Sequence, residues 1–155
     1  MAHTFMSQLV WSGALEPART VEGFSRDLTV SVGGLSLPRS AAPDFRGDSL
    51  RANPEQLFVA SLSACQALTY LFLAARSTIA IAAYSDQAVG TLAMENGRLR
   101  MTRVVLRPRI IVADERAAAE ARELVEKAHR ACFIANSVSC VVEVEPRVEA
   151  AAQAA

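Results

Sequence analysis

The segment Asn53-Pro54-Glu55-Gln56-Leu57, followed by Cys65 ten residues after the glutamate, decides the fold of this chain. Its asparagine is a good helix N-cap and its proline suits the first helical position. Its glutamine stands three residues after the cap, where the side chain can bond back to the backbone. We therefore expect a helix that runs from this segment to about Arg76.

The expected helix is apolar on almost every face. Its large apolar side chains are Leu57, Phe58, Val59, Leu62, Leu68, Tyr70, Leu71, Phe72 and Leu73. Such a helix is either buried in a core or spans a membrane, and a span needs about twenty mostly apolar residues. Four polar residues interrupt this one: Ser61, Ser63, Gln66 and Thr69. We interpret it as a core helix and expect no membrane role.

Composition predicts a single domain over residues 1–155. Half of the 155 residues are hydrophobic (52%) and 21% are charged, which suits one core. The 16 basic and 16 acidic side chains cancel and form no long block, so we expect no nucleic-acid partner. Residues 1–8 lack the pattern of a secretory signal, and we predict a cytoplasmic protein. Three cysteines are too few for a disulfide scaffold and fit transient thiol chemistry.

Upstream of the helix, alternating residues predict two strands, Thr4 to Trp11 and Leu28 to Val32, which form a hairpin around a polar stretch from Ala14 to Arg26. Leu35 to Ser40 adds a short strand. Residues 41–52 are rich in turn residues and predict an irregular surface loop of the kind that is often functional.

Downstream of the helix the pattern returns to strands. Ile79 to Met94 and Arg98 to Val112 flank Asn96-Gly97, a strong hairpin signal. A last strand is expected from Val138 to Val148, before an alanine-rich tail, residues 150–155, that should be frayed. The layout predicts an α+β fold.

A second helix is expected after Asp114, which can cap it. Its apolar face repeats at three- and four-residue spacing: Ala117, Ala121, Leu124, Val125, Ala128 and Cys132. Cys132 therefore lies at the end of the helix, on its buried side.

Together these motifs resemble the OsmC/Ohr family, whose members reduce organic hydroperoxides with two cysteines. The resemblance spans nearly the whole chain and rests on Phe24 to Asp27, Asn53 to Leu57, Ala60 to Cys65 and Ala128 to Val138. It is strongest to a subgroup whose second motif reads Cys-Phe-Ile-Ala-Asn-Ser. The resemblance implies an OsmC-like fold, with antiparallel strands packed around a buried central helix, and an intertwined homodimer with its sites at the interface.

Two residues depart from the family pattern. Gln66 stands where this subgroup often has histidine, and Phe133 replaces the proline that is common after the second cysteine. Both departures affect what the resemblance implies about the hydroperoxide substrate and the rate of its reduction.

The resemblance also implies a mechanism. Cys65 attacks the O–O bond as a thiolate and becomes a sulfenic acid. Cys132 resolves this acid as a disulfide, and an external dithiol, in the family typically of the lipoyl type, reduces the disulfide. No metal and no cofactor are implied, and His129 has no partners at metal-ligand spacing.

A cysteine in an apolar helix needs a nearby cation and donors to ionise. The resemblance points to Arg26, which is followed by Asp27 as in the family's arginine-aspartate pair, with Arg19 as second choice. Glu55 would hold the arginine. Glu55 and Cys65 lie about 15 Å apart if they share one regular helix. Either the glutamate and arginine serve a partner chain, or the helix starts later and the loop folds back.

Each of these residues also has a structural interpretation. Without the motif, Cys65 and Cys132 are buried packing residues, Glu55 favours the helix dipole, and Arg26 is a solvated charge. Cys140 has no motif support and is taken as structural. The alternative function is an OsmC-like redox-sensing or small-molecule-binding protein with little peroxidase turnover.

Overall fold

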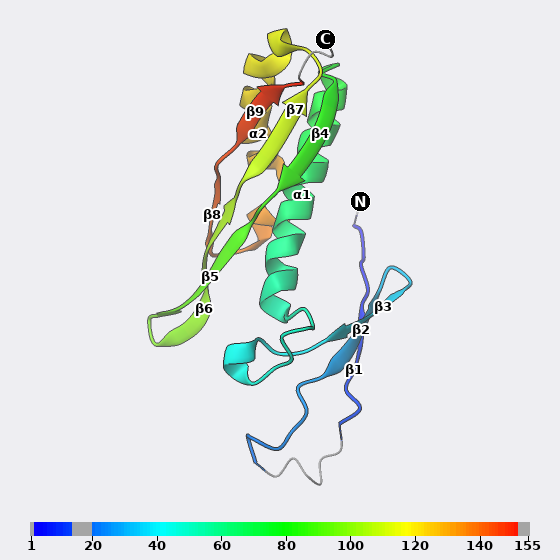
Figure 1. Ribbon diagram of the computed structural model, residues 1–155, viewed down its shortest axis with the longest axis vertical. Coiled ribbons are helices and arrows are strands. Elements are labelled where there is room, and N and C mark those ends of the chain that lie inside the picture. The colour runs from blue at the N-terminus through cyan, green and yellow to red at the C-terminus, as the bar shows by residue number, and fades with distance from the viewer. Residues whose placement is uncertain (1, 14–19, 152–155) are drawn as a thin grey trace. The chain divides into compact units, whose positions relative to one another are not determined.

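The computed structural model of the protein describes residues 2–13 and 20–151 (Figure 1). The chain divides into two compact units, Met1–Leu57 and Phe58–Ala155. The sequence-based expectation of a single domain stays a prediction.

The N-terminal unit contains a three-stranded antiparallel sheet in the order β1-β2-β3. Its strands are β1 (Gln8–Val10), β2 (Leu28–Val32) and β3 (Leu35–Arg39). The predicted pairing of the first two strands is confirmed, although β1 is shorter than expected. Gly33 and Gly34 both have positive φ angles and form the tight turn into β3. Residues 41–52 form the expected loop, which includes a 3₁₀ turn, η1 (Pro43–Phe45).

Helix α1 (Pro54–Arg76) begins as its capping residues predict. The Asn53 side chain accepts a hydrogen bond from the Gln56 N–H at 2.8 Å, and the Gln56 side chain accepts one from the Asn53 N–H at 3.0 Å. This reciprocal pair satisfies two amide groups that the first turn leaves without helical partners. The helix ends at Arg76. Beyond it, Thr78 has a φ of 56° and lets the Ile79 N–H bond back to the Ala74 carbonyl.

Burial of α1 is confined to one stripe in the single chain. The buried side chains, spaced four residues apart, are Leu62, Gln66, Tyr70 and Ala74. Leu68 is 69% exposed and Phe72 is 60% exposed. The expected burial of almost every face is therefore not met within one chain. Among the described residues, α1 is long and apolar enough to cross a membrane by length and composition, a test that the core helices of folded domains also pass.

The C-terminal unit contains two three-stranded sheets, ordered β4-β7-β9 and β5-β6-β8. Each of the three long predicted strands is broken once and passes from one sheet to the other (Figure 1). The six resulting strands are β4 (Ile81–Asp86), β5 (Val89–Glu95), β6 (Arg98–Leu106), β7 (Pro108–Val112), β8 (Val141–Val144) and β9 (Arg147–Ala150).

Proline and Asp86 explain where these strands break. Pro108 and Pro146 lack the N–H that would continue a ladder. Asp86 accepts the Arg107 N–H at 2.7 Å and the Ser63 hydroxyl of α1 at 2.5 Å, and so ties the break to the helix. The predicted hairpin is confirmed at Asn96 and Gly97, whose φ angles of 51° and 74° suit a two-residue turn.

The resemblance implies antiparallel strands, whereas the C-terminal unit contains both antiparallel and parallel pairs. β4 pairs with β7 and β5 with β6 in antiparallel fashion, but β6 with β8 and β7 with β9 are parallel. The cause is α2 (Ala118–Ala131), which follows a 3₁₀ turn, η2 (Glu115–Ala117), and carries the chain over to β8. A parallel return requires such a crossover connection.

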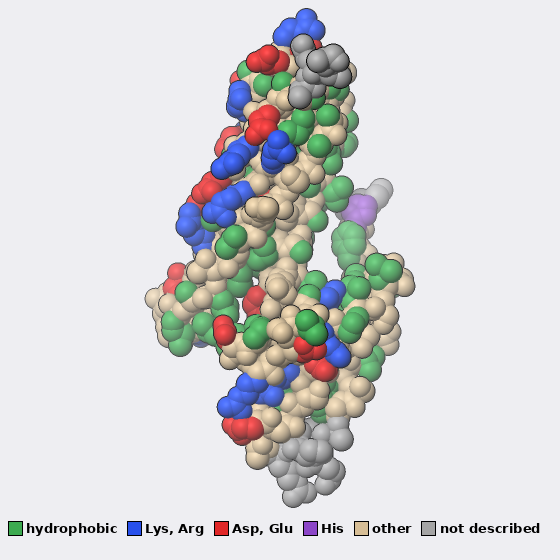
Figure 2. All heavy atoms as spheres, viewed as in Figure 1, with side chains coloured by type: hydrophobic (Ala, Val, Ile, Leu, Met, Phe, Trp, Pro, Cys, Tyr) green, Lys and Arg blue, Asp and Glu red, His purple; other side chains and the backbone are tan. Residues whose placement is uncertain are grey.

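The predicted face of α2 supplies much of the core. Ala121, Leu124, Val125 and Ala128 are buried against Tyr70 of α1 and the strand β7. Arginine and glutamate side chains pair across the parallel strands, at Arg103–Glu143, Arg107–Glu145 and Arg109–Glu149. Charged side chains of both signs gather over these strands in Figure 2. The inner side of the sheets is thus apolar and the outer side is solvated.

Candidate active site

Two of the predicted site residues, Cys65 and Cys132, meet in the C-terminal unit. Cys65 lies in the middle of α1 and is partly exposed, whereas Cys132 follows the last residue of α2 and is 1% exposed. Both are free thiols, and their side chains are hydrogen bonded to each other. Two thiols in contact can form a disulfide once one of them has been oxidised.

Two contacts between the helices hold α1 against α2. Gln66 donates its side-chain N–H to the Val125 carbonyl at 3.3 Å, and the Tyr70 hydroxyl donates to the Ala121 carbonyl at 3.3 Å. The donors are four residues apart on α1 and the acceptors are four apart on α2. These contacts fix the register in which the end of α2 reaches Cys65.

The surroundings of Cys65 favour its thiolate. Burial raises the pKa of Cys65, but hydrogen bonds from the Cys132 thiol, the Ile134 and Phe133 N–H groups and the Thr69 hydroxyl lower it, and the net pKa lies below its usual value. The Ile134 nitrogen lies 3.5 Å from the Cys65 sulfur. Cys65 therefore ionises more readily than an ordinary cysteine, and its thiolate is the nucleophilic form.

The surroundings of Cys132 favour its protonated form. Burial and the contact with Cys65 raise the pKa of Cys132 to about 11. Of the two thiols, Cys65 thus gives up its proton first and Cys132 retains its own. This order suits one thiol that attacks a substrate and a second that donates a proton and then closes a disulfide.

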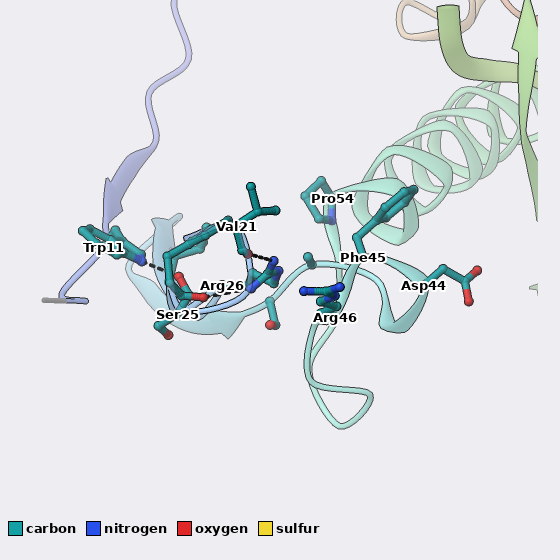
Figure 3. Close-up of a pocket in the computed structure, with 12 residues that line it drawn as sticks. Trp11, Val21, Ser25, Arg26, Asp44, Phe45, Arg46 and Pro54 are labelled. Atoms are coloured by element: carbon teal, nitrogen blue, oxygen red, sulfur yellow. Dashed lines mark hydrogen bonds between the residues drawn. The ribbon is translucent and has the colours of Figure 1, made fainter. Parts of the chain in front are cut away.

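Arg26 lies in the N-terminal unit and lines a cavity of about 690 Å³ (Figure 3). Its guanidinium donates to the Val21 carbonyl at 2.6 Å and the Phe24 carbonyl at 2.9 Å, and lies 4.2 Å from the centre of the Phe24 ring. The guanidinium is thus held in place by its own loop. Asp27 forms an ion pair with Arg51 at 3.3 Å. Arg19, the second choice, lies outside the described residues.

The cavity is mainly apolar with a cationic side. Its apolar lining comes from Trp11, Val21, Phe24, Leu28, Phe45 and Pro54. Arg46 lines the cavity together with Arg26. Arg46 has a φ of 64°, and its guanidinium forms an ion pair with Glu22 at 3.1 Å. A volume in this range suits a small organic molecule.

Glu55 stands in the first turn of α1, and its Oε2 atom is buried with no hydrogen-bond partner among the described residues. The helix is continuous from Pro54 to Arg76, so the alternative in which it starts later is wrong. Ten residues at about 1.5 Å each keep Glu55 about 15 Å from Cys65 along the same helix. These two residues are therefore not brought together within one helix.

The remaining sequence candidates lie at the edge of the C-terminal core. Cys140 packs against the cluster that contains Leu62, Val104 and Leu106, as expected for a structural residue. The Nδ1 atom of His129 is buried without a hydrogen-bond partner in the described part of the chain. Within that same part, three or more His, Cys, Asp or Glu side chains nowhere gather as a metal site would require.

Sequence reasoning missed several residues of these sites. Thr69 contacts Cys65 and stands four residues after it, so helical spacing contains the signal that could have found it. The Phe133 and Ile134 donors are backbone groups, which residue types do not reveal. Arg46 lies in the loop of residues 41–52, and no motif distinguishes it from the other residues of that loop.

Comparisons with known proteins agree with this architecture. The chain is similar to an OsmC-like protein of unknown function from Vibrio cholerae, with 30% identity over 94% of this chain and 100% of that one and a TM-score of 0.86. It is also similar to an organic hydroperoxide resistance protein OsmC from Legionella pneumophila, with 22% identity, coverage of 96% and 98%, and a TM-score of 0.70. The chain is similar as well to an organic hydroperoxide resistance protein from Elizabethkingia anophelis, with 22% identity over 97% of this chain and 99% of that one and a TM-score of 0.71.

No curated protein matches the chain. The family model described as OsmC-like protein matches residues 47–147, which include α1, the strands β4 to β8, α2 and the two cysteines that are in contact. The recognition made from the sequence motifs is thereby confirmed, and the α+β fold agrees with the solved OsmC-like structures. The chain belongs to the family of OsmC-like proteins.

Proposed function

We propose that the protein is a thiol-dependent peroxidase that reduces organic or lipid hydroperoxides to alcohols. The observation that carries the proposal is the contact between Cys65, whose pKa is lowered, and Cys132, whose pKa is raised to about 11. Similar structures from Legionella pneumophila and Elizabethkingia anophelis are named organic hydroperoxide resistance proteins, which agrees with this substrate class.

The proposed reaction has three steps. The Cys65 thiolate attacks the distal oxygen of the hydroperoxide, the O–O bond breaks, and the departing alkoxide takes a proton to leave as the alcohol. The resulting sulfenic acid condenses with the Cys132 thiol, forming the disulfide and releasing water. An external dithiol, of the lipoyl type, reduces the disulfide by thiol-disulfide exchange and is itself oxidised.

Arg26 and Glu55 are proposed to serve the thiol of a partner chain in an intertwined homodimer. A guanidinium beside the peroxide stabilises the charge of the attacking sulfur and of the leaving oxygen, and a carboxylate orients it. Two observations support a partner: α1 keeps Glu55 about 15 Å from Cys65 of its own chain, and α1 leaves Leu68 and Phe72 exposed. Arg46 and Arg19 are the other candidates for this arginine.

The proposal includes the cellular compartment in which the reaction takes place. We place the protein in the cytoplasm, where dithiol reductants recycle disulfides. The apolar cavity beside Arg26 favours a second candidate, a small-molecule-binding or redox-sensing protein that uses the same two cysteines once and turns over slowly.

Turnover separates the two candidates. The reduced protein is mixed with a slight excess of cumene hydroperoxide, free thiols are counted, and the disulfide is mapped by mass spectrometry. The peroxidase loses two thiols rapidly and forms a Cys65–Cys132 bridge. In a second reaction, with both hydroperoxide and dihydrolipoic acid in large excess, it consumes many equivalents of hydroperoxide. A sensor consumes about one equivalent.

Three variants assign the roles. Cys65→Ser should abolish peroxide consumption, and Cys132→Ser should accumulate a trappable sulfenic acid at Cys65. Cys140→Ser is the matched control, because Cys140 takes no part in the proposed reaction, and it should retain turnover. Thiols that stay reduced for many minutes in the unmodified protein would refute the peroxidase.

A further inference from the structure

The chain turns sharply after α2 and passes over Cys65. Cys132, at the end of the helix, has an extended backbone with φ −68° and ψ 115°. Beyond it the Ser137 N–H bonds to the Ile134 carbonyl at 3.0 Å, and the Ser137 hydroxyl bonds to the Phe133 carbonyl at 2.7 Å. These bonds occupy the carbonyls of the turn, while the Ile134 N–H points at the Cys65 sulfur, 3.5 Å away.

We propose that the peptide N–H groups of Phe133 and Ile134 are catalytic groups that hold the negative charge on the Cys65 sulfur. The segment that begins at Cys132 would then supply the resolving thiol and also stabilise the thiolate of Cys65. This inference rests on the proposed role of Cys65 as the attacking thiol. It adds N–H groups of the same chain to the proposed arginine as groups that stabilise the thiolate.

Three features support this assignment. The donors identified at Cys65 are all neutral, and both N–H groups contribute to its lowered pKa. Peptide N–H groups held in a closed turn need little reorganisation when charge develops on a neighbouring atom. The Phe133 side chain is 80% exposed, so the contribution of this residue comes from its backbone.

Neighbouring titratable groups stay uncharged in the relevant pH range. Cys132, from the end of α2, has its pKa raised to about 11 by burial and by Cys65. Tyr84 of β4 has its pKa raised by burial, Asp86, Tyr70 and Cys132. The titration of Cys65, whose pKa is lowered, is therefore not overlaid by the ionisation of Cys132 or Tyr84.

The test removes the Phe133 N–H by the substitution Phe133→Pro. Proline restricts the preceding residue to extended backbone, which Cys132 already has, so the variant is expected to fold. Phe133→Ala removes the exposed ring and retains the N–H. The pH midpoint for alkylation of Cys65 by iodoacetamide is measured by mass spectrometry, with the alkylation of Cys140 in the same sample as a control for opening of the fold.

Phe133→Pro should raise the Cys65 midpoint by about one pH unit, and Phe133→Ala should leave it unchanged. Equal midpoints in Phe133→Pro and the unmodified protein, or an equal rise in Phe133→Ala, would overturn the proposal. If the proline variant does not fold, an amide-to-ester replacement at Phe133 removes the same N–H and retains the side chain, and the same rise is expected.

The reaction with hydroperoxide adds a second readout. A rise of about one unit lowers the thiolate fraction about tenfold below both midpoints, and a more basic thiolate is about threefold more nucleophilic. Phe133→Pro should therefore react about threefold more slowly at low pH and about threefold faster above both midpoints. The alkylation result does not depend on peroxide reduction, so failure of this inference and failure of the proposed function give different results.

Discussion

Replacing Gln66 with methionine should stabilise the protein although it removes a hydrogen bond between α1 and α2. Gln66 is 1% exposed; its Nε2 atom donates to the Val125 carbonyl at 3.3 Å, but its Oε1 atom is buried without a partner in the described part of the chain. A hydrogen bond contributes about 1 kcal/mol, whereas a buried unsatisfied group costs about 1–3 kcal/mol. Gln66→Met removes both and fills nearly the same volume.

The net change is an increase of about 1 kcal/mol in the free energy of unfolding. For a chain of this size this raises the Tm by about 2–4 °C. The Val125 carbonyl lies inside α2, where the helix supplies its own donor, so the substitution creates no new unsatisfied group. Thermal and urea unfolding should be followed at one fixed protein concentration, because association of chains shifts the apparent stability.

Tyr70→Phe is the matched control. Its hydroxyl donates to the Ala121 carbonyl at 3.3 Å, one turn along both helices, and is satisfied. Loss of this hydroxyl should lower the free energy of unfolding by about 1 kcal/mol. If Gln66→Met is instead less stable by 1 kcal/mol or more, on the order of the Tyr70→Phe loss, Oε1 has a partner in solution and the reasoning is refuted.

Two further predictions concern the backbone. Thr78→Gly should raise the free energy of unfolding by about 1 kcal/mol, because the φ of 56° at this position strains a β-branched residue; Ser77→Gly, beside it, should lower stability in the same urea titration. Gly90→Ala should lower stability by about 1–3 kcal/mol, because a Cβ there would lie 2.5 Å from both Met101 and Val59. The double variant with Val59→Ala should recover part of that loss, and no recovery would contradict the stated contact.

The local signals in the sequence were strong where one short segment determines its own structure. The capping pair Asn53 and Gln56 satisfies itself within four residues, and the turn at Asn96-Gly97 needs two positive φ angles that these residues adopt readily. The buried face of α2 follows from helical spacing alone. Each of these structures was predicted because the energy that decides it is local.

Strand breaks and strand direction could not be predicted in the same way. The break after Asp86 depends on the Arg107 N–H and the Ser63 hydroxyl, which come from other elements of the chain. Alternation of residues has the same period in parallel and antiparallel strands, so the pairing of β8 with β6 is invisible in the pattern. The crossover through α2 decides the direction.

In the candidate site, too, the sequence predicts some features and the fold determines others. The motifs identify Cys65 and Cys132, but the pKa values of both thiols depend on burial, on the contact between them and on backbone N–H groups, none of which residue types reveal. The resemblance points to Arg26 as the cation beside the thiol. The structure shows Arg26 held on its own loop by two carbonyls and the Phe24 ring.

The apolar surface of α1 connects the fold to the proposed function. The helix contains more apolar positions than its own chain buries, and Cys65 stands one residue before the buried Gln66, beside the face that contains Leu68 and Phe72. Hydrophobic periodicity records that a position is buried but not by which chain. A partner chain would explain why α1 has apolar side chains, such as Leu68 and Phe72, on a face that remains exposed in one chain. A partner that covers this face would also exclude water from the neighbourhood of Cys65, where electrostatic stabilisation of the reacting sulfur is strongest.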